Sequence, residues 1–117
     1  MGRGLSVSLE GDDLNKILSD MSTKVRDAVE QAVGDETVQV GQDMHDTVPV
    51  DEGELQDSIV TAHDGLEGSA EAQARHAGFV EHGTSNTPAQ PFALPAAEQA
   101  RSRFVDRVSD AVAKETS

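Results

Sequence analysis

Residues 14–33 read LNKILSDMSTKVRDAVEQAV, and apolar side chains recur in this stretch at steps of three and four positions. Such spacing places them along one face of a helix. The pattern resumes after residue 34 and stops before Pro49, so the sequence predicts a long helix over residues 12–48. The apolar face consists of Leu14, Ile17, Leu18, Met21, Val25, Ala28, Val29, Ala32, Val33, Val40, Met44 and Val48.

Two glycines lie inside this predicted helix. Gly34 and Gly41 each cost up to about 1 kcal/mol in a helix interior, which favours a kink or short break over residues 34–41. Asp12 and Asp13 offer carboxylates that can cap the N-terminus. The apolar face is interpreted as core packing, with a seam between subunits as the alternative.

Shorter elements are predicted on both sides of the helix. The alternation of LSVSL within residues 4–10 has the period of a strand. Asp51 and Glu54 have the spacing of a capping box and predict a single short turn of helix after the proline. Residues 58–72 are predicted as a hairpin that turns at an Asp-Gly pair, with a polar return strand.

The last third of the chain is predicted as helix, loop and helix. Residues 75–83 suit a short helix that ends at Gly83 in a left-handed conformation. Residues 84–95 carry three of the four prolines and form an extended loop, and residues 96–114 close the chain as a helix. The closing helix turns inward Ala97, Ala100, Phe104, Val108, Ala111 and Val112, and it directs Arg101, Arg103 and Arg107 toward an otherwise negative protein.

Composition limits the class of protein. The 117 residues are enough for one domain, with a formal net charge of −13. Leu, Ile, Val and Phe make up only 25 of the 117 residues, close to the level at which a highly charged chain stays disordered. Such a thin core is expected to gain stability from assembly with neighbouring chains. A surface of this charge repels nucleic acid, so direct DNA binding is not expected.

Counts of particular residues exclude some further classes of protein and leave others open. The chain has no cysteine, and its apolar runs fall far short of the roughly 20 residues that span a bilayer. Its first residues lack the apolar stretch of a signal peptide, so we expect the protein to act where it is made or to leave the cell by lysis. Only three lysines occur among many carboxylates, which fits either a protein of very salty cytoplasm or an acidic protein from a GC-rich genome.

The four histidines do not form a recognisable catalytic or metal site. His76 and His82 are six residues apart, which does not place both rings on one helix face. Ser85 lies three residues from His82, but no third orienting group accompanies them. The chain also has no glycine-rich phosphate loop. We therefore predict no catalytic residue, no cofactor and no metal.

The residues that do stand out direct the backbone around aromatic side chains. They are concentrated in the region of the proline-rich loop, where proline preorganises an extended segment and removes hydrogen-bond donors. Two interpretations follow. The loop docks on its own domain, or it is a strap that inserts Phe92 into an adjacent subunit or ring. The residues concerned are Phe79, Gly83, Pro88, Pro91, Phe92 and Pro95.

Two blocks of sequence carry a family resemblance. Residues 76–96 read HAGFVEHGTSNTPAQPFALPA and residues 49–59 read PVDEGELQDSI. Both resemble, in order and distance, the head–tail joining family of long-tailed phages and related archaeal viruses. This is the HK-type "gene product ten-like" family, to which lambda minor tail protein Z is similar. The sequence departs from the family pattern at His76, Phe79, His82, Leu94 and Gln56, so charge contacts made by basic residues of relatives are not carried over.

The resemblance implies an α+β fold, with a small antiparallel sheet packed against one long N-terminal helix. It also implies a non-enzymatic tail-completion protein of the virion neck, made in the host cytoplasm. That protein would form a ring, expected to be six-fold, between the head-closure (stopper) protein and the tail terminator and tube. DNA would pass through its lumen without specific binding. The positions that match the family's central block and strap, and hence the expected assembly interface, are Phe79, Val80, Glu81, Gly83, Thr84, Pro88, Pro91, Phe92 and Pro95.

Two other functions remain open at this point. The charge of −13 also permits an acidic protein that mimics DNA and inhibits a host nuclease or polymerase. Such a mimic needs carboxylates at phosphate-like spacing on one face, whereas the distinctive residues here are Pro, Gly and Phe. A metal-dependent hydrolase is the third hypothesis, and metal analysis of the purified protein would test it.

Overall fold

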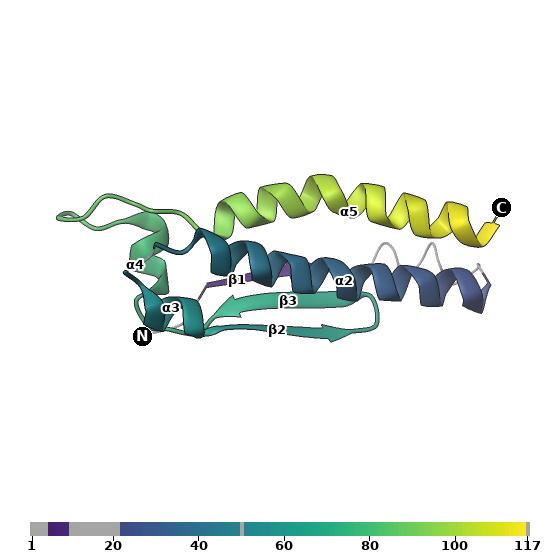
Figure 1. The fold of residues 1–117 in the computed structure, drawn as a ribbon, viewed down its shortest axis with the longest axis horizontal. Helices are drawn as coiled ribbons and strands as arrows, with labels where there is room; N and C mark the ends of the chain where they lie inside the picture. Colours follow the sequence, from purple (N-terminus) through teal and green to yellow (C-terminus); the bar gives the residue numbers. More distant parts are fainter. Residues whose placement is uncertain (1–4, 10–21, 50, 117) are drawn as a thin grey trace.

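The computed structural model describes residues 5–9, 22–49 and 51–116 of the chain. It has the α+β fold that the family resemblance implied, with one long N-terminal helix, a small antiparallel sheet and a C-terminal helix (Figure 1). The elements are β1 (Leu5–Leu9), α2 (Thr23–Thr47), α3 (Gly53–Asp57), β2 (Ile59–Asp64), β3 (Glu67–Ala72), α4 (Ala77–His82) and α5 (Ala93–Thr116).

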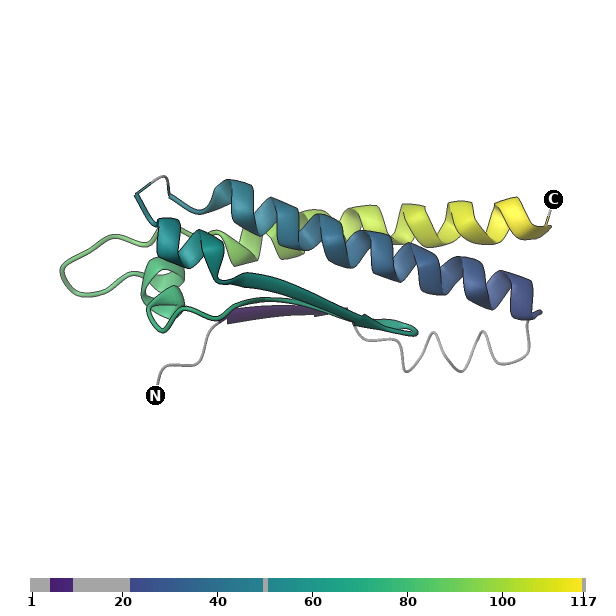
Figure 2. The ribbon, with the colours of Figure 1, turned by 60° about the horizontal axis from the view of Figure 1, so that its bottom comes forward.

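The molecule has two layers, because α2 and α5 run side by side on one face of the sheet (Figure 2). The three described strands are antiparallel in the order β1-β3-β2. The polar return strand of the hairpin, β3, is thus the central strand. It suits that place because its alternate residues Gly68, Ala70 and Ala72 are small and buried, which lets α2 lie close to the sheet.

Helix α2 starts later than the sequence predicts. Ser22 is extended, at φ −64° and ψ 152°, and its side chain accepts a hydrogen bond of 3.3 Å from the Val25 amide. Residue 22 is therefore not helical. The prediction of an unbroken helix from residue 12 is wrong at this position. The predicted caps Asp12 and Asp13, and the apolar face before residue 22, lie outside the described residues.

The predicted break over residues 34–41 is also wrong, because α2 is continuous through both glycines. Their role is close packing on β2. A Cβ on Gly34 would lie 2.8 Å from the His63 ring, and one on Gly41 would collide with the Thr61 methyl group. The free-energy cost of glycine in a helix is offset here because its missing side chain lets α2 pack closely against β2.

Two apolar clusters flank a charged centre between α2 and α5. The cluster near the α4 end includes Met44, Leu55 and Phe92, and the cluster at the far end joins Val29 and Val33. In α5, Ala100 is buried, and Phe104, Val108 and Val112 pack partly buried against the far cluster, as predicted.

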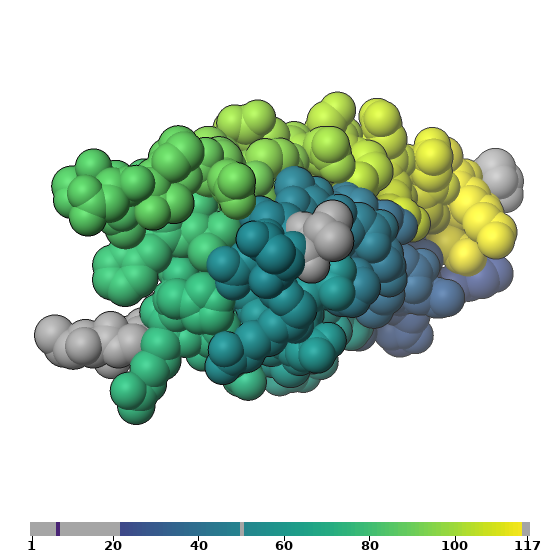
Figure 3. All heavy atoms as spheres, turned by 60° about the vertical axis from the view of Figure 1, so that its left-hand side comes forward, coloured from purple at the N-terminus to yellow at the C-terminus, as the bar shows by residue number. Residues whose placement is uncertain are grey.

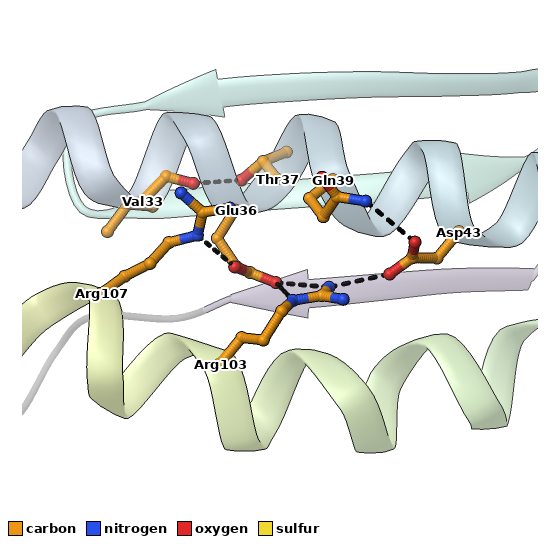
Figure 4. Close-up of polar contacts among 7 residues, drawn as sticks. All are labelled: Val33, Glu36, Thr37, Gln39, Asp43, Arg103 and Arg107. Carbon is orange, nitrogen blue, oxygen red and sulfur yellow. Dashed lines mark hydrogen bonds and ion pairs between the residues drawn. The ribbon is translucent and has the colours of Figure 1, made fainter.

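Between the clusters, the fully buried Glu36 carboxylate accepts hydrogen bonds from two arginines of α5 (Figure 4). Arg103 Nη2 and Arg107 Nε each lie 2.7 Å from a Glu36 oxygen, and Arg103 Nη2 is 2.8 Å from Asp43 Oδ2. The hydrogen bond to Glu36 raises the pKa of the Arg103 guanidinium above its ordinary value. The stability that Arg103 contributes is therefore complete at neutral pH, and it is lost only when the solution is alkaline enough to deprotonate the guanidinium. Arg101, by contrast, is exposed.

The short helix α3 begins one residue later than the predicted capping box requires. Its N-cap is Glu52, which makes no capping bond with its side chain. That carboxylate instead lies 2.8 Å from His76 Nε2. Within the described residues, no helix combines the length and apolar character needed to cross a membrane.

Candidate assembly surface

Helix α4 positions the start of α5 through one buried carboxylate. Glu81 Oε1 accepts hydrogen bonds from the amides of Phe92 and Ala93 at 2.9 and 2.8 Å. Its Oε2 accepts one from the Leu94 amide at 3.0 Å. Phe92 directly precedes α5, and Ala93 and Leu94 are its first two residues. Helix geometry leaves the amides at this end without partners inside the helix, and the helix dipole favours a negative charge there. Glu81 is only 5% exposed, so it acts inside its own chain.

This contact corrects two predicted boundaries. The loop ends at Phe92 and not at residue 95, and α5 begins at Ala93 and not at residue 96. Pro95 therefore lies in the first turn of α5. Proline is tolerated there because an amide at that position has no partner within the helix. No local pattern indicates this start, because the capping carboxylate comes from a different helix.

Phe92 is fully buried in the core of its own chain. It packs in the same apolar cluster as Met44 and Leu55. The prediction that Phe92 inserts into an adjacent subunit is therefore wrong for this conformation, and the alternative, in which this part of the loop docks on its own domain, is what the structure has. Burying an aromatic side chain in its own core leaves none of its surface for a neighbour.

The loop between α4 and α5 is held in a defined shape. Gly83 has φ 77° and ψ 176°, a positive-φ conformation that is extended rather than the predicted left-handed one. A Cβ there would lie 2.7 Å from the Ala89 amide nitrogen. Across the loop, the Thr84 amide donates to the Thr87 carbonyl at 2.8 Å, and the Gln90 amide donates to the Val80 carbonyl at 2.8 Å.

Beyond these contacts the loop tip, defined here as residues 84–91, is exposed at every position. It projects past α4 at one end of the molecule (Figure 1), and it forms a lobe in the space-filling view (Figure 3). Phe79 on α4 is 65% exposed at the same end. The expected interface residues thus divide into a buried root, with Glu81 and Phe92, and exposed positions that include Phe79, Thr84, Pro88 and Pro91.

The loop tip also differs from the rest of the chain in charge. Residues 82–97 contain no Asp, Glu, Lys or Arg, and no other stretch without them is longer than six residues. A neutral, preorganised projection on an acidic chain loses little entropy on binding and meets little charge repulsion. It is therefore suited to contact with another acidic protein.

His63 and His76 have ordinary partners within the chain. His76 contacts Glu52, and His63 Nε2 lies 2.8 Å from the Gly65 carbonyl oxygen. Among the described residues, no group of three or more His, Cys, Asp or Glu side chains is arranged to hold a metal ion. The sequence interpretation missed one candidate, Val38, which is 62% exposed. The signal was available, because Val38 is a valine of α2 outside the predicted apolar face.

The fold and this surface define a small α+β protein whose exposed, uncharged projection is suited to packing against other protein chains. Residues 12–83, more than half of the chain, match the family model described as "Bacteriophage HK97-gp10, putative tail-component". The chain belongs to this family of phage tail components, as the two sequence blocks predicted. It is thus a structural protein of the virus particle and acts among other virion proteins. No curated protein and no solved structure gave a match.

The matched region includes α2, the β2–β3 hairpin and α4, and it ends at Gly83. It contains the whole of the block at residues 49–59 and the first part of the block at residues 76–96. The loop tip and α5 lie beyond it. What the tip does is therefore argued from its exposure, its hydrogen bonds and its lack of charge.

Proposed function

We propose that residues 1–117 form one tail-completion domain of the virion neck. Copies of the chain assemble into a ring, six-fold by family resemblance, between the head-closure protein and the tail terminator and tube. The observation that carries this proposal is the neutral loop tip, which projects from a chain of net charge −13. A contact between identical acidic chains is favoured where it is free of unpaired carboxylates, because like charges placed opposite one another are costly.

The lumen of the proposed ring suits the passage of DNA. An acidic wall makes no phosphate contacts, so no counterions are released and the duplex is not held. The buried Glu36 and Glu81 carboxylates are satisfied within the chain and take no part in this wall. The chain would meet DNA only as it passes through, and the interface residues would be the exposed part of the set, led by Phe79, Pro88 and Pro91.

A gene disruption tests the proposed role. Without the chain, infected cells should accumulate filled heads and finished tails that do not join, as seen by electron microscopy. Supplying the wild-type chain should restore joined particles. Joined, infectious particles made in its absence would contradict the proposal. Recovery of the chain with a host nuclease or polymerase, and not with particles, would favour the DNA-mimic hypothesis instead.

The excess of carboxylates also supports a saline host, such as a halophilic archaeon. High salt shortens the screening length from about 10 Å at 0.1 M to about 3 Å at 1 M, which weakens self-repulsion. The purified protein should then melt at a clearly higher temperature in multimolar KCl than in dilute buffer. Equal melting temperatures in both would contradict this part of the proposal.

A further inference from the structure

A shallow groove lies between α2 and β2, away from the loop tip. Its volume is about 220 Å³, and Gly41 forms part of its wall. Because Gly41 has no side chain, β2 approaches α2 closely here, with the Thr61 methyl group against the helix backbone. Val38 is 62% exposed at this groove. The complete lining is Val38, Gly41, Gln42, His45, Ile59 and Thr61.

This lining contains no Asp, Glu, Lys or Arg. Apart from His45, it comes from two stretches, residues 37–42 and 58–63, that are each six residues long without such a residue. These are among the longest uncharged stretches outside residues 82–97. The fold brings them side by side, so that α2 and β2 together present an uncharged hollow on an acidic molecule.

We propose that the loop tip of one copy docks in the α2–β2 groove of the next copy. This inference rests on the proposed ring and names the surface that receives the tip. An uncharged projection and an uncharged hollow on the same acidic chain match one another, whereas docking the tip on an acidic part of a second copy would remove water from carboxylates that the uncharged tip cannot pair. The hollow between α2 and α5 is larger, at about 340 Å³, but its lining includes Asp35, Asp110 and Glu115.

The occupant has to come from another copy because the loop cannot reach its own groove. Its root is fixed by Glu81 and by the bond from the Gln90 amide to the Val80 carbonyl. The tip points away from the body of the molecule (Figure 1). Contact between two different surfaces of identical chains is heterologous, and heterologous contacts close into rings when the rotation between copies is suitable.

The chain has no cysteine, which permits a clean cross-linking test. Particles are made with a chain that carries Val38→Cys in the groove and Ala89→Cys in the loop tip, and they are oxidised mildly. A matched control carries Ala89→Cys with Val105→Cys, since Val105 on α5 is 63% exposed and Val38 is 62% exposed. We expect a ladder of disulfide-linked multimers on a non-reducing gel for the first pair, and a single monomer band for the control.

The outcomes separate this inference from the proposed function. If the chain is present in joined particles but the first pair stays monomeric, docking in the groove is wrong and the neck role stands. If both pairs give equal ladders, the contact is not specific and docking in the groove is again wrong. If the chain is absent from particles, both the neck role and the docking are wrong.

A charge substitution gives an independent readout. Val38→Glu places a carboxylate in the groove, where it would face the docked tip without a partner, and should lower the yield of infectious particles about ten-fold or more. Val105→Glu, the matched control, should leave the yield unchanged. Equal yields from the two variants would overturn the proposal, provided that urea unfolding shows both to be folded.

Discussion

The root and the tip of the loop between α4 and α5 differ in what they contact. At the root, Phe92 is fully buried, and Glu81 accepts hydrogen bonds from the Phe92 amide and from the first two amides of α5. At the tip, every residue from 84 to 91 is exposed. The root therefore stabilises the monomer, and the tip leaves its surface for another chain. An anchor in the chain's own core gives the tip a fixed shape before it meets a partner, which lowers the entropy lost on binding.

The largest effect on stability is expected at the root. Phe92→Ala removes a fully buried aromatic side chain and should lower the free energy of unfolding by about 3–5 kcal/mol. Urea unfolding of the purified chain measures this loss. Phe92→Leu, which keeps most of the apolar volume, should cost less than about 1.5 kcal/mol. An unchanged midpoint for Phe92→Ala, together with a block in particle assembly, would show that Phe92 serves a neighbour after all.

A smaller loss is expected where α4 meets α5. Glu81→Gln removes the charge at the helix N-terminus and sets an amide group against the Leu94 amide. We expect a loss of about 1–3 kcal/mol in unfolding free energy. Glu98→Gln, at an exposed position on α5, is the control and should change the unfolding free energy by less than about 0.5 kcal/mol. Equal values for the two variants would contradict the capping role of Glu81.

Two glycines near the loop offer the next comparison. Gly83→Ala puts a Cβ against the Ala89 backbone at a positive φ and should cost about 1–2 kcal/mol. Gly78→Ala in α4 meets nothing within 4 Å and should be neutral or stabilising by up to about 1 kcal/mol, because alanine favours the helix. Thermal unfolding of the two variants measures the difference. If Gly83→Ala is as stable as Gly78→Ala, the loop does not need its observed shape.

The smallest change in stability is expected at the exposed end of the molecule. Phe79→Ser should alter the unfolding free energy by less than about 0.5 kcal/mol, because the side chain is 65% exposed. The same variant should nevertheless give fewer joined particles, which electron microscopy of lysates can count. Normal particle numbers would remove Phe79 from the assembly surface.

Local patterns predicted much of this fold. The β2–β3 hairpin lies within the predicted residues 58–72, but its turn is at Gly65 and Leu66, one residue after the predicted Asp-Gly pair, because Asp64 still pairs with Glu67 at the end of β2. Gly83 has the positive φ expected of the residue that follows α4. The start of α2 was missed because Ser22 offers the same capping chemistry as Asp12 and Asp13. Gly34 and Gly41 were interpreted as helix breakers, yet they serve contact with β2, which lies far away in sequence.

The assembly surface was predicted only in part. Sequence marked the loop as unusual, but it could not tell which core receives Phe92, because an apolar residue has the same pattern whether it packs on its own chain or on a neighbour. The partner of Glu81 was hidden for a related reason, since its hydrogen bonds cross eleven to thirteen residues to another helix. Such contacts depend on tertiary geometry and leave no short-range periodicity.

A cryo-EM reconstruction of the neck of the intact particle tests the central claim most directly. We expect a ring of copies in which each Phe92 lies in the core of its own chain and each loop tip contacts the adjacent copy. Loop tips that face solvent without touching another chain, or a neck that lacks this protein, would contradict it.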